Sequence, residues 1–170
     1  MKQRGFTLIE LVITVTIMVI LLALAAVNLS STQASQRDAE RATDVATISN
    51  NLETFYETGT NISTVLNRYP STALLATGET SIKASLPDIE INSVIAPDAT
   101  TAAISFIPAT NAIETVAGVL PKPTQTQYVY QPIQTNGALC TSEVQECRRY
   151  AIFYRTEIDN TVKKVTSKHQ

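Results

Sequence analysis

An uncharged apolar stretch near the N-terminus constrains the fold more than any other feature of this 170-residue chain. Residues 11–27 contain no charged residue, no Gly and no Pro, and their only polar members are Thr14 and Thr16. The wider segment 6–29 is long enough, as a helix, to cross a hydrocarbon core about 30 Å thick. We therefore expect a membrane-spanning helix at the start of the chain.

The charges around this stretch indicate its orientation and its kind. Lys2 and Arg4 precede it and the next basic residue is Arg37, so the N-terminus is expected in the cytoplasm and the rest outside. A cleaved secretory signal is the alternative, because the sequence Ala-Leu-Ala-Ala at 23–26 is similar to a cleavage site. Glu10 argues against a plain signal or anchor, since a carboxylate in an apolar helix costs up to about 3 kcal/mol on insertion.

The residues around Glu10 carry a family resemblance. The sequence KQRGFTLIE at 2–10 resembles the class III signal of type IV pilins and type II secretion pseudopilins. The resemblance implies that residues 1–5 are a leader, that a prepilin peptidase cuts after Gly5, and that the new N-terminal Phe6 is N-methylated. It also implies that Glu10 is the carboxylate used in assembly.

Elementary electrostatics gives Glu10 the same role. Cleavage frees an α-amino group on Phe6, which is a cation near neutral pH. In a staggered stack of parallel helices, the amine of one subunit can pair with the Glu10 carboxylate of its neighbour, so that two charges costly alone in lipid become a pair. The alternative is that Glu10 merely extends to the lipid headgroups.

Beyond the apolar stretch the helix is expected to continue. There is no Pro or Gly between Phe6 and Gly59, which predicts a helix of about 80 Å over 6–58, with a membrane half at 6–29 and an amphipathic half at 30–58. Its apolar stripe is Ala42, Val45, Ile48 or Ser49, Leu52, Phe55 and Tyr56, and its outward face is Arg37, Asp38, Glu40, Arg41, Asp44, Asn50, Asn51 and Glu53. A coiled-coil stalk is the alternative.

The apolar half of the helix departs from the family pattern in one respect. Many type IV pilins carry Gly and Pro there; here 19–27 has neither, so helix unwinding in a filament is not implied.

Residues 59–170 are expected to form a globular α+β head, in which a small antiparallel sheet of three or four strands packs against the helix. A short helix is predicted at 71–77, between Ser71 as N-cap and Gly78. Strands are predicted at 102–107, 128–130 (ended by Pro132), 150–156 and 161–166, with a tight turn at Asp159 and Asn160. This pilin-like architecture is also what the resemblance implies.

The two cysteines of the chain, Cys140 and Cys147, lie in the segment placed outside the membrane. They are expected to form a disulfide, which for so short a loop contributes about 2.5 kcal/mol. The loop resembles the cysteine-bounded loop near the C-terminus of many pilins, although it is shorter. A redox or metal-binding pair is the alternative.

The role of two further sets of head residues can be interpreted in two ways. The aromatic residues of the predicted strands are either core or a stacking platform for a carbohydrate or nucleic acid: Tyr128, Tyr130, Tyr150, Phe153 and Tyr154. The late basic residues are either a solvated face or a DNA-binding surface, which some pilins of DNA-uptake systems have: Arg148, Arg149, Arg155, Lys163, Lys164 and Lys168.

Composition argues against an enzyme, because the chain has one histidine, His169, two cysteines and a net charge of −2. No metal or other cofactor is expected.

The resemblance implies a structural subunit of a type IV pilus used for adhesion, twitching or DNA uptake. Its partners would be further copies of itself, a prepilin peptidase, and an inner-membrane platform with its assembly ATPase. It would be a single-pass protein of the cytoplasmic membrane before assembly and part of an extracellular filament afterwards. The alternatives are a minor pilin, a type II secretion pseudopilin, a membrane-anchored binding domain that never polymerises, and an anchored enzyme.

Overall fold

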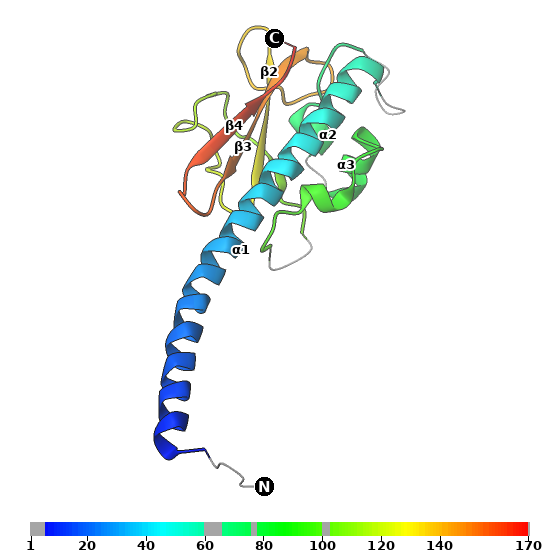
Figure 1. Cartoon of the computed structure of the whole chain (residues 1–170). Helices are drawn as coiled ribbons and strands as arrows, with labels where there is room; N and C mark the ends of the chain where they lie inside the picture. The colour runs from blue at the N-terminus through cyan, green and yellow to red at the C-terminus, as the bar shows by residue number, and fades with distance from the viewer. Residues whose placement is uncertain (1–5, 60–65, 76–77, 100–102, 170) are drawn as a thin grey trace.

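The computed structural model describes residues 6–59, 66–75, 78–99 and 103–169. A long N-terminal helix extends away from a head that is gathered around its C-terminal half (Figure 1). The expected α+β, pilin-like architecture is confirmed. The predicted leader at 1–5 lies outside the described residues.

Helix α1 runs without interruption over Leu8–Thr58. It begins two residues after the predicted start because Thr7 is its N-cap. It ends at Gly59, whose φ of 65° favours glycine and whose N–H donates to the Phe55 carbonyl at 2.8 Å. By length and composition, α1 is long and apolar enough to cross a membrane.

The head adds short helices and a four-stranded sheet with the order β1-β2-β3-β4. The helical elements are α2 (Thr72–Leu75), α3 (Glu79–Ser85) and the 3₁₀ turn η1 (Ile91–Val94). The strands are β1 (Phe106–Pro108), β2 (Tyr128–Gln134), β3 (Cys147–Arg155) and β4 (Val162–Thr166).

The sheet is mixed, so the expectation of a purely antiparallel sheet is wrong at one pair. Strands β2, β3 and β4 pair antiparallel, but β1 pairs with β2 in parallel, with Phe106 opposite Tyr128. The connection over 109–127 carries the chain back along the sheet before β2 begins, and strands so connected run in the same direction.

Strand β2 also continues through Pro132, where the sequence predicts its end. The N–H of Tyr128 donates to Ser105 and the carbonyl of Tyr130 accepts from Ala109, so these alternate residues bond toward β1. Pro132 is next in this alternation, but β1 has already ended at Pro108. No ladder donor is therefore lost at the proline.

Other element boundaries differ from the predictions in smaller ways. The predicted helix at 71–77 is α2, the predicted strand at 102–107 is described as a strand only from Phe106, and β3 starts earlier than predicted. The turn between β3 and β4 is longer than a tight hairpin and is closed by the Thr156 N–H donating to Thr161 O at 2.9 Å. Helix α3 and η1 were not predicted, since neither has a side-chain N-cap that would mark its start.

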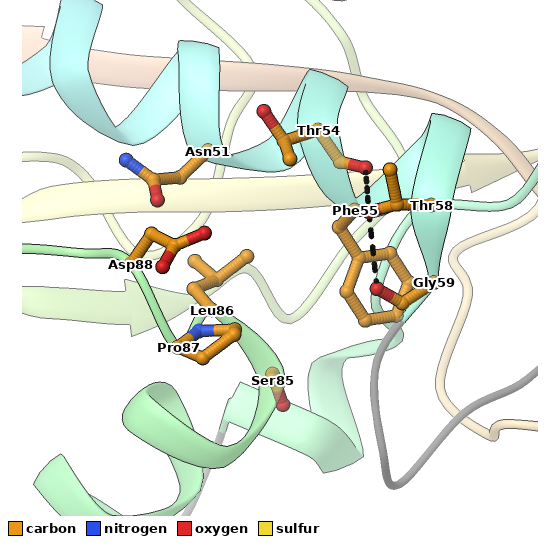
Figure 2. Close-up of a pocket in the computed structure, with 9 residues that line it drawn as sticks. All are labelled: Asn51, Thr54, Phe55, Thr58, Gly59, Ser85, Leu86, Pro87 and Asp88. Atoms are coloured by element: carbon orange, nitrogen blue, oxygen red, sulfur yellow. Dashed lines mark hydrogen bonds between the residues drawn. The ribbon is translucent and has the colours of Figure 1, made fainter.

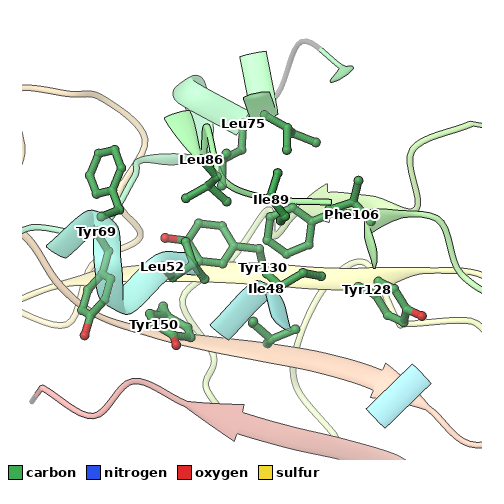
Figure 3. Packing of buried hydrophobic residues seen from close by; sticks show 14 of the residues in the cluster. Ile48, Leu52, Tyr69, Leu75, Leu86, Ile89, Phe106, Tyr128, Tyr130 and Tyr150 are labelled. Atoms are coloured by element: carbon green, nitrogen blue, oxygen red, sulfur yellow. The ribbon is translucent and has the colours of Figure 1, made fainter. Parts of the chain in front are cut away.

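The main core lies between α1 and one face of the sheet (Figure 3). Ile48 and Leu52 of α1 meet the rings of Tyr130 and Tyr150, and all four side chains are at most 1 % exposed. A second cluster covers the opposite face of the sheet, formed by Ala109, Val119, Val129, Ala151 and Phe153. Of the two interpretations of the strand aromatics, core is confirmed for the four buried ones, while Tyr154 is only partly buried.

Candidate assembly site and head surface

The first turn of α1 is organised by a reciprocal capping box between Thr7 and Glu10. The Glu10 N–H donates to Thr7 Oγ1 at 3.3 Å, and Thr7 Oγ1 also donates to Glu10 Oε2 at 3.2 Å. The Thr7 N–H points at the same carboxylate oxygen, 3.5 Å away. The box holds the carboxylate beside the helix N-terminus, where the free N–H groups favour a negative charge.

The rest of the apolar segment offers Glu10 no competing partner among the described side chains. The hydroxyls of Thr14 and Thr16 donate to the carbonyls of Leu11 and Val12, at 2.9 and 2.7 Å. Their polar groups are thus satisfied within the helix. Glu10 lies in the segment 6–24, whose described apolar side chains are all exposed.

Of the two residues predicted at the cleavage site, the structure describes only Phe6. Gly5 lies outside the described residues, and Phe6 is 78 % exposed immediately before the cap. Thr7 was not predicted as a site residue from the sequence. Its signal was a threonine three residues before a glutamate at the start of an apolar run, which is the sequence signature of a capping box.

The amphipathic half of α1 buries several charged residues that we expected on its outward face. Arg41 is 1 %, Asp44 9 % and Glu53 5 % exposed, whereas Ala42 of the predicted stripe is exposed. The prediction that Arg41, Asp44 and Glu53 lie on the outward face is therefore wrong, and so is the prediction that Ala42 belongs to the packed stripe. Each of the three buried side chains bonds to the head, and Arg41 does so through Nε, which donates to the Gln125 carbonyl at 2.8 Å.

Glu53 joins the end of α1 to the sheet and to the C-terminus. Its Oε2 accepts from the Tyr69 hydroxyl at 2.8 Å, and its Oε1 accepts from the Tyr150 hydroxyl and the Lys168 N–H, both at 3.0 Å. The His169 imidazole is 3.7 Å from Oε2. Burial, followed by the hydrogen bond to Glu53, raises the pKa of Tyr69 well above its usual range.

Asp44 forms a second buried contact with the sheet. Its Oδ2 accepts from the Tyr128 hydroxyl at 2.7 Å. Burial raises the pKa of Asp44 to about 6, an effect that the Tyr128 hydrogen bond opposes and nearby Glu40 reinforces.

Charged residues near the middle of α1 hold the β3–β4 turn. The Asp38 carboxylate accepts from the N–H groups of Glu157 and Ile158, at 2.7 and 3.0 Å. Arg37 donates to both Glu157 carboxylate oxygens, at 2.6 and 2.8 Å, and this hydrogen bonding lowers the pKa of Glu157. Arg41 donates to Asp38 at 2.8 Å and so completes the cluster.

The structure joins Cys140 to Cys147, the pairing expected from the sequence. Both half-cystines are at most 1 % exposed. Their carbonyls accept hydrogen bonds from the chain that follows α1: Tyr69 N–H to Cys147 O at 2.8 Å and Thr72 N–H to Cys140 O at 3.0 Å. The disulfide loop is therefore fastened to the segment before α2.

The late basic residues do not form one free surface. Arg148 pairs with Glu146 at 3.1 Å, and Arg149 pairs with Glu114 at 2.8 Å. These two arginines and Tyr56 line an open hollow of about 420 Å³. Lys163 and Lys164, on β4, are exposed. Binding of DNA by these residues stays a prediction.

The described part of the chain has no deep cavity near α1 that would suggest a bound small molecule. A small, partly open pocket between the last turns of α1 and residues 85–88 has a volume of about 30 Å³, enough for a water molecule (Figure 2). Among the described residues, no group of three or more His, Cys, Asp or Glu side chains could hold a metal ion.

An apolar N-terminal helix with a capped glutamate, continued into an α+β head, defines a pilin-like architecture. Residues 1–26 match the family model of the prokaryotic N-terminal methylation motif, which is the class III signal peptide of type IV pilins and pseudopilins. This match supports the type IV pilin or pseudopilin family, whose members are structural proteins, and implies a substrate of a prepilin peptidase. Together with the apolar helix, it indicates membrane anchoring before assembly. No curated protein and no solved structure matches the chain.

Proposed function

We propose that this chain is a structural subunit of a type IV pilus that polymerises through its N-terminal helix. The observation that carries the proposal is the methylation motif at 1–26, with Glu10 placed in the capped first turn of an exposed apolar helix. Cleavage after Gly5 and N-methylation of Phe6 would leave a cation two residues from the start of α1. That cation would pair with Glu10 of a neighbouring subunit.

The capping box supports this role physically. A carboxylate held beside free N–H groups is presented toward the end of the helix where a neighbour's amine would arrive. The cysteine-bounded loop favours a filament pilin over a secretion pseudopilin. A minor pilin, a pseudopilin and a non-polymerising anchored domain are the alternative outcomes of the test.

The test uses the full chain in its native host, with Glu10→Leu compared to Thr16→Leu, a control in the same apolar helix. We expect intact mass spectrometry to find the wild-type chain starting at N-methylated Phe6. We expect Glu10→Leu to be processed but absent from sheared filaments, and Thr16→Leu to assemble. A chain that still starts at Met1, a chain cut after Ala26, or Glu10→Leu filaments at the wild-type yield would refute the proposal.

A further inference from the structure

The disulfide loop, residues 141–146, is closed by a side chain as well as by its disulfide. Gln145 Oε1 accepts hydrogen bonds from the Thr141 and Ser142 N–H groups, at 2.7 and 3.0 Å, and from the Thr141 hydroxyl at 3.5 Å. The Gln145 N–H donates back to Ser142 O at 3.1 Å. One glutamine therefore folds the loop onto its own beginning, directly after Cys140.

The same glutamine also contacts the far end of the loop. Gln145 O accepts from the Cys147 N–H at 3.2 Å. Gln145 thus connects the residues that follow Cys140 to Cys147 itself, through backbone and amide groups, and this connection does not require the disulfide. It reduces the conformational freedom that has to be removed when the two cysteines are brought together.

The rest of the head fixes the backbones of the two cysteines. The Cys140 N–H donates to Pro132 O at 2.9 Å, and Cys147 is opposite Gln134 in the β2–β3 ladder. The carbonyls of both cysteines accept hydrogen bonds from the chain that follows α1. Strand β2 and the segment before α2 therefore place both cysteines through bonds in which their sulfurs take no part.

Both half-cystines belong to the main core and are at most 1 % exposed. A thiol or disulfide from solvent therefore reaches their sulfurs only when this part of the head opens locally. The loop between them is on the surface, where Val144 is 84 % exposed. The chain has no third cysteine that could compete for either sulfur.

We infer that Gln145 is a positioning residue for the Cys140–Cys147 disulfide. It holds the two thiols of the reduced, folded head close to each other, and it keeps the loop closed once the bond has formed. The head accordingly folds before it is oxidised, and the disulfide locks a loop that already exists. The inference does not depend on the proposed function, because it concerns the head alone.

The oxidation is an exchange with an external disulfide, for which oxidised glutathione is the probe. One cysteine thiolate attacks a glutathione sulfur, releases a glutathione thiolate and forms a mixed disulfide. The second cysteine thiolate attacks the protein sulfur of that mixed disulfide and releases the second glutathione. The protein thiols lose two electrons and two protons, and one glutathione disulfide becomes two thiols. Only the second attack is intramolecular, so it alone depends on how closely the loop holds the two sulfurs.

The first test measures the equilibrium constant for disulfide formation in the full chain in detergent, against mixtures of reduced and oxidised glutathione. Gln145→Ala removes the acceptor and leaves the reduced loop less ordered, so we expect it to lower the constant about fivefold or more, the factor that corresponds to one net hydrogen bond. Gln145→Glu keeps an acceptor oxygen and should remain within about twofold of wild type. Val144→Ala, the neighbouring exposed position, is the matched control and should also remain within about twofold.

The second test measures how fast dithiothreitol reduces the folded chain. Because reduction requires local opening, we expect Gln145→Ala to be reduced faster than wild type by about fivefold or more, and Gln145→Glu and Val144→Ala at close to the wild-type rate. The order of folding and oxidation is tested separately with Cys140→Ala and Cys147→Ala together. This chain should still unfold in one cooperative thermal transition, at a lower temperature than wild type.

Three results would overturn the inference. The first is a Gln145→Ala chain with the wild-type equilibrium constant and reduction rate. The second is an equal loss in Gln145→Ala and in either Gln145→Glu or Val144→Ala, which would show that the acceptor oxygen is not what matters. The third is a chain without cysteines that does not fold. None of these results bears on filament formation, so they leave the proposed function standing.

Discussion

The carboxylate of Glu53 connects parts of the head that are far apart in the sequence. It accepts hydrogen bonds from Tyr69, Tyr150 and the Lys168 backbone while only 5 % exposed. Removing such an acceptor leaves buried donors without a partner, which costs about 1–3 kcal/mol for each group. We therefore expect Glu53→Leu to lower the free energy of unfolding by roughly 2–4 kcal/mol.

Denaturant unfolding of the full chain in detergent measures this effect. Glu57→Leu, one helical turn further and exposed, is the matched control and should change the free energy little. Equal effects of the two substitutions would contradict the role given to the buried carboxylate.

Asp44 makes stability depend on pH in the opposite sense to a typical ion-paired acid. Because its pKa is raised from 3.8 to about 6, the folded chain holds a proton between roughly pH 4 and 6 that the unfolded chain releases. The contribution of this group to stability therefore falls as pH rises through that window. Asp44→Asn keeps an acceptor for Tyr128 and removes the titration.

We expect Asp44→Asn to be more stable than wild type at pH 7 by about 1–2 kcal/mol, and to differ little from it below pH 4. Unfolding of both proteins across this range gives the difference and cancels the opposite contribution of Glu157, whose pKa is lowered. A difference that does not change with pH would contradict the prediction.

At the scale of the elements, the β3–β4 turn is held by α1 through the Asp38 carboxylate, which accepts from two consecutive N–H groups. We expect Asp38→Ala to cost about 1–3 kcal/mol, because those donors and Arg41 lose a charged partner. Hydrogen exchange should increase at the amides of Glu157 and Ile158. Glu40→Ala, exposed two residues along, is the control, and equal exchange in both variants would refute the prediction.

The same element shows what could be predicted from the sequence. The absence of Gly and Pro between Phe6 and Gly59 was sufficient to predict α1 and its end, but the start was placed two residues too early because the Thr7 cap was not predicted. Arg41, Asp44 and Glu53 were placed on the wrong face because periodicity sorts residues by polarity. It cannot show that Tyr128 or Tyr150 brings a hydroxyl to meet a carboxylate.

The sheet was predicted less completely for a related reason. Alternating aromatics located β2 and β3, but strand direction depends on the path of the long 109–127 connection, which leaves no local pattern in the sequence. The loop over 110–120 was likewise not predicted, because Asn111 and Gln131 act through contacts between residues distant in the chain.

At the scale of the whole molecule, α1 has two separate segments, an exposed apolar one at its start and one that packs in the head at its end. Before Arg41, no described side chain of the helix is buried in the head, so the apolar segment should contribute little to the stability of the head. A chain starting at Ser30 keeps Arg37, Asp38 and all the buried positions of α1. We expect it to be a soluble monomer with the Cys140–Cys147 disulfide and a melting temperature within a few degrees of that of the full chain in detergent.

A chain starting at Ala42 is the matched comparison, since it removes only a further segment of the same helix, including Arg37, Asp38 and Arg41. It should melt well below the longer fragment, because the β3–β4 turn then loses its ion pairs to Arg37 and Arg41 and its carboxylate acceptor. Size-exclusion chromatography and thermal unfolding measure both fragments. If the fragment from Ser30 is unfolded, the membrane half of α1 is required for folding of the head. The prediction that the apolar segment contributes little to the stability of the head is then wrong.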